Sequence, residues 1–238
     1  MSNIVVVTGA SGFVGQHLIK YFHDNHGTLN IKEIRSVDLK PFKPDIDINL
    51  KIYMKHHQMD VCDEAKLEKV FEGASCIYHL AQKGMDHYYS NYSADITTSY
   101  WSKNINSIES VVNCMVSKDI QNIVFLGNAY CNLARCDNFG LSEDNYKGLS
   151  NSGYILGTYG ETKSRAELFL RTFAENNTTV SGKKLQVICV RPTIVYGEGN
   201  CKTLNALLDI CNQNDGVFPY CSGSRGLHQY VGFEFLFT

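Results

Sequence analysis

The chain has few of the features that mark metal sites, membrane spans or nucleic-acid binding. It contains nine cysteines, but no C-x-x-C pair occurs and none lies at zinc-site spacing, so no metal site is indicated. No apolar run is long enough to cross a bilayer, and we expect no transmembrane segment. The formal net charge is -2, which gives no general attraction to nucleic acid.

We also expect no secretory leader, because a strand-like run begins almost at once at Ile4. We therefore expect a cytoplasmic protein whose thiols are free. The 238 residues are 44% hydrophobic and 19% charged. This composition allows one sizeable core, or one domain with a small lobe.

A glycine-rich turn lies within the first fifteen residues. Ile4–Val7 is a β-branched run typical of a strand buried on both faces, and a helix with one apolar face follows the turn. Gly9 permits a tight turn, Gly12 lets the backbone approach phosphates, and Gly15 lets the helix pack on the strand. The helix N-terminus then faces an anionic pyrophosphate. The residues expected at the cofactor here are Gly9, Ser11, Gly12, Phe13, Val14 and Gly15.

The glycine spacing is G-x-x-G-x-x-G, and any tight turn from strand to helix can use such a triplet. A second strand, Glu33–Asp38, adds a carboxylate where a Rossmann fold holds the adenosine ribose hydroxyls. Asp38 would repel a 2′-phosphate, so NAD is favoured over NADP. Lys40 and Lys43 keep NADP open, and an aspartate that merely ends a strand is the alternative interpretation.

Strands and helices alternate along the rest of the chain. We expect strands at 56–61, 75–81, 123–127 and 185–191, and helices after Asp63 and at 102–118, 157–176 and 202–212. This alternation predicts an α/β fold, a Rossmann-type doubly wound parallel sheet with helices on both faces. Residues 1–200 would form the NAD-binding domain, and 201–238 a small, incomplete substrate lobe.

The carboxyl ends of the third and fourth strands supply further cofactor contacts. We expect Asp60 and Val61 at the adenine ring, and Leu80, Ala81 and Gln82 beneath the cofactor. His79 is interpreted as a packed strand residue. The aromatic-rich segment 82–101 is either a loop over the mouth of the site that holds an apolar substrate or a plain surface excursion.

A Y-x-x-x-K pair lies in the helix predicted at 157–176. The spacing places Tyr159 and Lys163 on one helix face, a turn apart. A free phenol has a pKa of about 10, and a nearby ammonium favours the phenolate. Tyr159 could then exchange a proton with a substrate oxygen while a hydride moves to or from nicotinamide. Lys163 could also hold the ribose of that nicotinamide, so both residues are expected at the cofactor. An ordinary helix pair is the alternative.

Together these two motifs resemble the extended branch of the short-chain dehydrogenase/reductase superfamily. The segment 79–81 (HLA) resembles the strand before its active site, 159–167 (YGETKSRAE) its catalytic helix, and 191–199 (RPTIVYGEG) the next strand and turn. The resemblance implies that Asn104 is a structural residue that positions water near the lysine. It also implies that the backbone at Pro192 and Val195 lines the nicotinamide.

Within this branch, RPTIVYGEG and the QYVG at 229–232 are most similar to the 3β-hydroxysteroid dehydrogenase/isomerase family. That family oxidises a 3β-hydroxyl to a ketone with NAD. The resemblance implies a small sterol-like substrate, steroid or sterol metabolism, a homodimer and peripheral attachment at the endoplasmic reticulum. Nucleotide-sugar epimerases and dehydratases and flavonoid-type reductases share most of these motifs, so a nucleotide sugar stays open.

The sequence departs from the family pattern at two places. The superfamily normally has Ser or Thr just after the fifth strand, but 127–130 reads GNAY and Asn128 is nearest. Its amide can donate a hydrogen bond but cannot relay a proton, and loss of one such donor costs roughly 10²–10³ in rate. Tyr130 and Ser142 are alternative hydroxyls. Family members also continue well past the Tyr-Val-Gly segment, where this chain has only the apolar tail 233–238, so we expect a truncated chain.

The sequence therefore supports three functions. The first is an NAD-dependent oxidoreductase of a secondary alcohol, with Tyr159 as acid/base, Lys163 as its modulator, and Asn104 and Asn128 in support. The second is a dinucleotide-binding sensor without catalysis, and the third a nucleotide-sugar epimerase or dehydratase.

Overall fold

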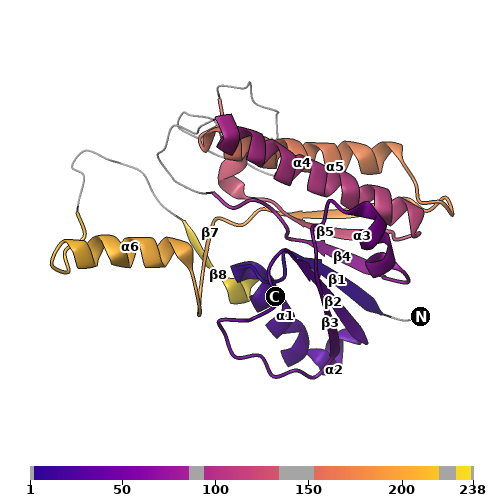
Figure 1. Ribbon diagram of the computed structural model, residues 1–238, viewed down its shortest axis with the longest axis horizontal. Coiled ribbons are helices and arrows are strands. Elements are labelled where there is room, and N and C mark those ends of the chain that lie inside the picture. Colours follow the sequence, from indigo (N-terminus) through magenta and orange to yellow (C-terminus); the bar gives the residue numbers. More distant parts are fainter. Residues whose placement is uncertain (1–2, 86–93, 134–152, 220–228, 237–238) are drawn as a thin grey trace.

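The computed structural model describes residues 3–85, 94–133, 153–219 and 229–236. Its centre is a six-stranded sheet in the order β3-β2-β1-β4-β5-β6, and every neighbouring pair is parallel (Figure 1). The strands are β1 (Ile4–Thr8), β2 (Glu33–Asp38), β3 (Tyr53–Gln58), β4 (Cys76–His79), β5 (Asn122–Leu126) and β6 (Gln186–Val190). The prediction of a Rossmann-type parallel sheet is confirmed.

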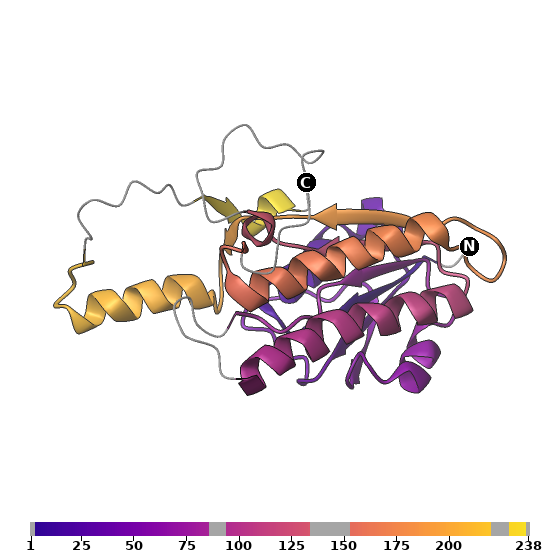
Figure 2. The same ribbon diagram turned by 90° about the horizontal axis from the view of Figure 1, so that it is seen from above.

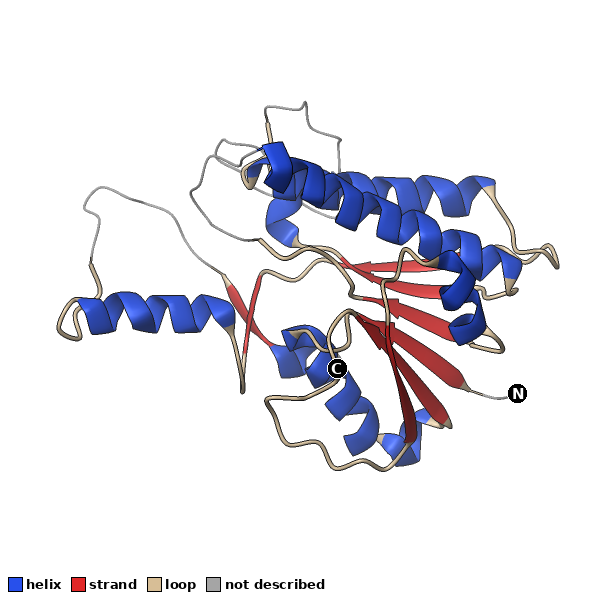
Figure 3. Ribbon diagram, viewed as in Figure 1, coloured by secondary structure: helices blue, strands red, loops and turns tan. Residues whose placement is uncertain are grey.

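Helices cover both faces of this sheet (Figure 3). One face carries α1 (Phe13–Asp24) and the short α2 (His26–Leu29), and the other carries α3 (Glu64–Phe71), α4 (Ala94–Ser117) and α5 (Gly157–Asn176). Side chains alternate across a strand, so Val5 and Val7 of β1 pack in the cluster beneath α1 while Val6 packs with α3, α4 and α5. This double burial explains the continuous apolar run at the N-terminus.

The prediction of a strand over 56–61 is wrong by about three residues, because β3 covers Tyr53–Gln58. Its end is set by Asp60, whose carboxylate accepts the Cys62 backbone N–H at 3.0 Å and turns the chain. Its beginning was hidden because this is an edge strand. Tyr53, for example, is 67% exposed, so apolar residues do not mark the start.

The interpretation of 82–101 as a loop is wrong in its last part, since α4 begins at Ala94. Tyr100 lies fully buried against α5, whereas Trp101 is 37% exposed, so the aromatic residues of this turn face different ways and obscure the helical period. Residues 86–93 and 134–152 lie outside the described part of the chain. The sequence predicts a loop at 128–153, and the described start of this segment contains the 3₁₀ helix η1 (Ala129–Asn132).

The short strand β7 (Ile194–Tyr196) lies in the segment 191–199, for which the resemblance implies a strand and turn, whereas nothing in the sequence suggested β8 (Tyr230–Gly232). The two form a separate parallel pair. Next to them lie α6 (Lys202–Gln213) and the 3₁₀ helix η3 (Phe233–Leu236). Figure 2 shows α6 extending away from the sheet, and no residue of α6 is buried. The domain division at residue 200 stays a prediction, and β7 pairs with β8 across it.

Within the described residues, no helix combines the length and apolarity needed to span a membrane.

Candidate functional site

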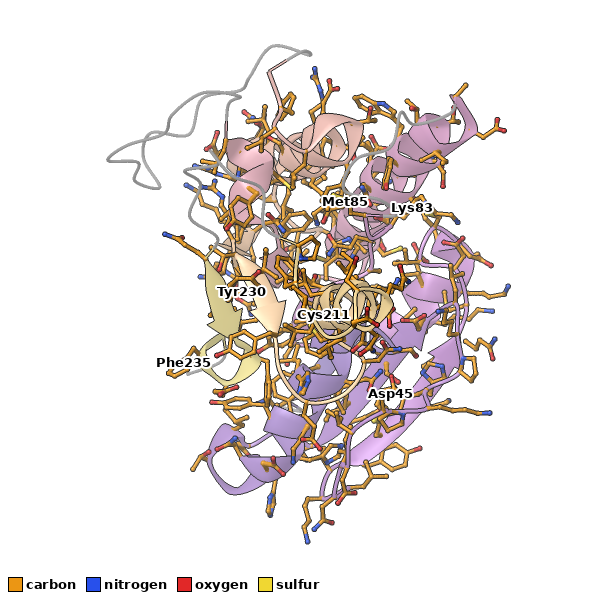
Figure 4. All side chains as sticks on the ribbon, turned by 90° about the vertical axis from the view of Figure 1, so that its left-hand side faces the viewer. Asp45, Lys83, Met85, Cys211, Tyr230 and Phe235 are labelled. Atoms are coloured by element: carbon orange, nitrogen blue, oxygen red, sulfur yellow. The ribbon has the colours of Figure 1, made fainter. Side chains whose placement is uncertain are left out.

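A cavity of about 720 Å³ opens at the carboxyl ends of β1, β2 and β4. It lies where the strand order reverses on either side of β1, the usual ligand position in an open parallel sheet. Its lining includes these residues predicted from the sequence: Gly9, Ser11, Gly12, Phe13, Val14, Gly15, Asp38, Asp60, Val61, Leu80, Ala81, Gln82 and Val195. Figure 4 looks onto this end of the molecule, with the lining residues Lys83 and Asp45 above and below α6.

The glycine-rich turn is shaped by backbone contacts that leave no room for side chains. Gly9 has φ +70° and donates its N–H to the Val37 carbonyl oxygen at 2.8 Å, which ties the turn to β2. A Cβ on Gly9 would lie 2.6 Å from the Ala81 nitrogen and from the Leu80 carbonyl carbon. At Gly15 a Cβ would collide with the Gly9 carbonyl oxygen. The tight turn therefore requires glycine at both positions, and both line the cavity at the N-terminus of α1.

Asp38 stands at the end of β2 and faces this turn. Its carboxylate accepts the backbone N–H of Ser11 at 2.9 Å and that of Lys40 at 3.0 Å. The acceptor predicted for ribose hydroxyls is thus held beside the turn predicted for the pyrophosphate.

Asp60 forms a second charged wall of the cavity. Hydrogen bonds from the Cys62 amide and from Lys103 hold the pKa of Asp60 below its usual value, and the Lys103 Nζ lies 2.9 Å from the carboxylate. Sequence reasoning missed Lys103 of α4. The lysine meets Asp60 only because α4 packs against this edge of the sheet, so no local pattern signals it.

Sequence reasoning also missed the opposite wall of the cavity. It contains Gln16, His17, Asp45, Ile46, Glu198, Asn200, Cys201, Lys202 and Thr203. Gln16 receives the Asp45 backbone N–H at 2.7 Å and donates to the Ser11 carbonyl at 3.0 Å, so the β2–β3 connection closes over the glycine-rich turn.

Tyr159 and Lys163 lie on one face of α5 as predicted, but they do not line the cavity, and neither do Asn104, Asn128 and Pro192. Tyr159 is 6% exposed and packs with Tyr100 and Cys131, its ring centroid 5.7 Å from that of Tyr100. The Lys163 ammonium donates to the Leu126 carbonyl at 2.7 Å and lies 4.6 Å from the Phe125 ring centroid. Burial lowers the pKa of Lys163 to about 8.

Asn104 links this helix to the cavity. Its Oδ1 accepts the backbone N–H of Lys83, a lining residue, at 2.9 Å, and its Nδ2 donates to the Thr162 hydroxyl at 3.0 Å. Leu126 makes a second link, because it lines the cavity while its carbonyl receives Lys163. Lys163 therefore lies one residue behind the cavity wall, and Thr162 of the same helix is tied to that wall through Asn104.

The departure at Asn128 has a local structural role. Its Oδ1 accepts the Tyr130 backbone N–H at 2.9 Å and so caps η1. The Tyr130 hydroxyl accepts the Gln229 N–H at 3.0 Å and donates to the Gln229 carbonyl at 3.4 Å, which ties it to the start of β8. Ser142 lies outside the described residues.

His79 is a packed strand residue, as predicted. It is 2% exposed, its Nδ1 lies 2.9 Å from the Thr8 hydroxyl, and burial lowers its pKa to about 3. The ring is therefore neutral near pH 7 and holds the ends of β1 and β4 together.

Comparison with known proteins adds an independent finding. A model of the 3-beta hydroxysteroid dehydrogenase/isomerase family matches residues 6–232. A 3 beta-hydroxysteroid dehydrogenase/Delta 5-->4-isomerase of Vaccinia virus (strain Ankara) is 22% identical and matches 96% of this chain and 63% of its own length. The chain thus spans less than two thirds of the length of this relative.

Two further proteins are similar. The N-acetyl-alpha-D-glucosaminyl-diphospho-ditrans,octacis-undecaprenol 4-epimerase of Escherichia coli O157:H7 is 25% identical over 84% of this chain and 51% of its own length. The structure of MoeE5 in complex with UDP-glucuronic acid and NAD superposes with a TM-score of 0.74 at 21% identity, and covers 98% of this chain and 69% of that one. At this identity the superposition supports the fold.

Proposed function

Because the chain belongs to the 3-beta hydroxysteroid dehydrogenase/isomerase family, we propose that it is an NAD-dependent oxidoreductase acting on the secondary alcohol of a sterol-like substrate. The observation that carries the proposal is the cavity at the carboxyl edge of the sheet, with a glycine-rich turn and Asp38 on its wall and with Lys163, one helical turn after Tyr159, bonded to the lining residue Leu126. These features supply a dinucleotide site and an acid/base group in one place.

The residues present fit NAD. A Cβ at Gly9 or Gly15 would collide with the backbone of neighbouring residues, so the tight turn requires glycine at both positions. Backbone N–H groups at the start of α1, near Phe13, would hold the pyrophosphate. Asp38 would accept the adenosine ribose hydroxyls, and its charge disfavours a 2′-phosphate. The nicotinamide supplies the hydride acceptor when it is bound.

Tyr159 and Lys163 would handle the proton. The Tyr159 oxygen would accept the hydroxyl proton of the alcohol as it is oxidised to the ketone. With a pKa of about 8, Lys163 is mainly protonated at pH 7, and its charge favours the phenolate. Asn104, through Thr162, would hold the catalytic turn of α5 in register with the cavity wall.

Asn128 would take part as a donor alone. Its oxygen is occupied by the Tyr130 amide, so its NH₂ group is the part suited to the substrate oxygen. Such a donor stabilises developing negative charge on a carbonyl or alkoxide oxygen.

A nucleotide sugar is the second candidate substrate, favoured by the 25% identity to the Escherichia coli epimerase. A third candidate is a dinucleotide-binding protein without turnover, favoured by the absence of a hydroxyl at Asn128. The substrate, a homodimer and attachment at the endoplasmic reticulum remain predictions.

The test combines binding and turnover. NADH binding is followed by fluorescence, and NAD reduction is assayed with 3β-hydroxysteroids and with nucleotide sugars. We expect Tyr159→Phe to bind NADH like the wild type while kcat falls by about 10²–10⁴, because only the proton acceptor is lost. Tyr78→Phe is the matched control, since Tyr78 packs beneath α1 on the other face of the sheet.

Each outcome separates the candidates. Steroid turnover lost in Tyr159→Phe supports the dehydrogenase, and turnover of nucleotide sugars alone supports the epimerase reading. NADH binding without turnover, even in Asn128→Ser, supports the sensor. If neither NADH nor NADPH binds at millimolar concentration, the proposal is wrong.

A further inference from the structure

A third ionisable side chain follows Tyr159 and Lys163 on the same face of α5. Glu167 lies one helical turn beyond Lys163, so the three residues recur at intervals of four. All three are buried, and Glu167 is only 1% exposed. A carboxylate so far from water needs a partner.

Arg191 is that partner. It follows β6 directly, and its Nε lies 2.9 Å from Oε1 and 3.0 Å from Oε2 of Glu167, while its Nη2 also bonds Oε1. Arg171 lies farther off, at 4.0 Å. A buried ion pair contributes little net stability relative to apolar residues of similar size. Because the Glu167–Arg191 pair adds little stability, we infer its role from the groups that lie near the Glu167 carboxylate.

The carboxylate faces the ends of two strands. A Cβ on Gly127 would lie 3.1 Å from the Glu167 Oε2, and the Gly127 N–H donates to the Val190 carbonyl at 2.7 Å. Two residues on, the Ala129 N–H donates to the Pro192 carbonyl at 2.9 Å. The Glu167–Arg191 pair thus lies directly beneath the backbone that carries Asn128 and Pro192.

The carboxylate also acts on Lys163. The Lys163 ammonium contacts Phe125 and Leu126 of β5, and the other ionisable groups that act on it electrostatically are His79 of β4, Cys131 of η1, Cys189 of β6 and Glu167 of α5. Burial raises the pKa of Cys131 and of Cys189 to about 12, so both thiols are uncharged near pH 7. His79 is neutral there as well, which leaves Glu167 as the negative charge in this set.

We propose that Glu167, fixed by Arg191, is the counter-charge of the Lys163 ammonium and a positioning residue of the site. The inference builds on the function proposed for Tyr159 and Lys163. The negative charge of Glu167, held in an interior without water, offsets the cost of removing the Lys163 ammonium from water. Without it, Lys163 loses its proton at a lower pH, and the phenolate of Tyr159 loses its support there.

The test reads Lys163 directly, so that it does not depend on turnover. The full chain is labelled with ¹³C,¹⁵N-lysine, the Lys163 signal is assigned with Lys163→Arg, and its pH titration is followed by NMR. We expect Glu167→Gln to move the Lys163 titration about one pH unit lower, and Glu167→Asp to retain it within a few tenths.

Glu161→Gln is the matched control. Glu161 is also buried on α5 and is paired with Arg165 at 2.9 Å, but it is not among the groups that shift Lys163. We expect Lys163 in Glu161→Gln to titrate at the same pH as Lys163 in the wild type. If Glu167→Gln does not fold, the neutral double variant Glu167→Gln/Arg191→Gln should shift the titration in the same direction.

A Lys163 titration unchanged in folded Glu167→Gln, or in the double variant if that one is used, overturns this inference, whether or not the protein turns over any alcohol. If turnover is found, the pH profile of kcat in Glu167→Gln should move to lower pH by a similar amount. Absence of turnover in the wild type with an intact titration shift rejects the proposed function and leaves the electrostatic pairing standing.

Discussion

Gly9 shows how strongly the cavity depends on one absent side chain. It combines a left-handed backbone, at φ +70°, with a close approach to the end of β4. The first property costs an L-residue roughly 1–2 kcal/mol, whereas the second obliges the wall of the cavity to move. These two effects can be separated, because Gly73 has φ +69° with nothing within 4 Å of its Cβ position.

We expect Gly9→Ala to weaken NADH binding at least about 10-fold, or about 1.4 kcal/mol, because the added Cβ displaces Leu80 and Ala81. Gly73→Ala should lose roughly 1–2 kcal/mol of stability from its left-handed backbone alone and should bind NADH like the wild type. Fluorescence titration and thermal melts of the two variants check this. Equal affinities for Gly9→Ala and wild type would contradict the assignment of the turn.

Connections between elements are held by polar contacts that no periodicity reveals. Asp119, at the turn between α4 and β5, accepts hydrogen bonds from Thr179 and Ser181 and pairs with Lys183 at 2.6 Å. It thereby fastens the α5–β6 connection to the α4–β5 turn. These hydrogen bonds, that of Lys183 first, hold the pKa of Asp119 well below its usual value.

This contact predicts a pH-dependent stability. A carboxyl group whose pKa is lower in the folded chain stabilises it fully above the unfolded pKa of 3.8, and the contribution is lost as the pH falls toward the folded pKa. We expect Asp119→Asn to lower the melting temperature by a few degrees at pH 7 and by less and less below pH 3.8. Asp24→Asn, in the exposed Lys20 pair, should change little. A melting difference that is constant with pH would rule out the carboxylate as its cause.

In the whole molecule, the C-terminal elements are joined to the nucleotide end through α1. His17 of α1 stacks on Phe233 with ring centroids 3.7 Å apart, and its Nε2 donates to the Glu198 carbonyl at 2.9 Å. His17 and Glu198 both line the cavity. A change at η3 is therefore expected to reach the cofactor site.

We expect Phe233→Ala to cost about 1–2 kcal/mol of stability, because the half-buried ring is lost, and to raise the NADH dissociation constant about 3–10-fold. Phe235→Ala is the control in the same 3₁₀ helix, since Phe235 is 71% exposed. Chemical denaturation and fluorescence titration measure both effects. If Phe233→Ala loses stability but binds NADH with unchanged affinity, η3 does not influence the cofactor site.

Where a feature is encoded by neighbouring residues, the sequence was sufficient. The buried run of β1, the glycine-rich turn, Asp38 at the end of β2 and the helix Gly157–Asn176 all follow from spacing over a few residues. Such patterns also predicted the part of the cavity lining that lies in the glycine-rich turn and at the strand ends, because in a parallel sheet the carboxyl ends of the strands meet at one edge.

Contacts between distant segments were decided by the tertiary structure alone. The pairing of β7 with β8, the Asp60–Lys103 contact and the Glu167–Arg191 pair join residues far apart in the chain, and no local pattern records them. The burial of Tyr159 against Tyr100 and Cys131 is likewise a result of packing between distant segments. Spacing places a phenol and an ammonium on one helix face, but only the packing of α5 on α4 and β5 determines how dry that face is. The loss of water contact in turn lowers the pKa of Lys163 to about 8, which is close to neutral pH.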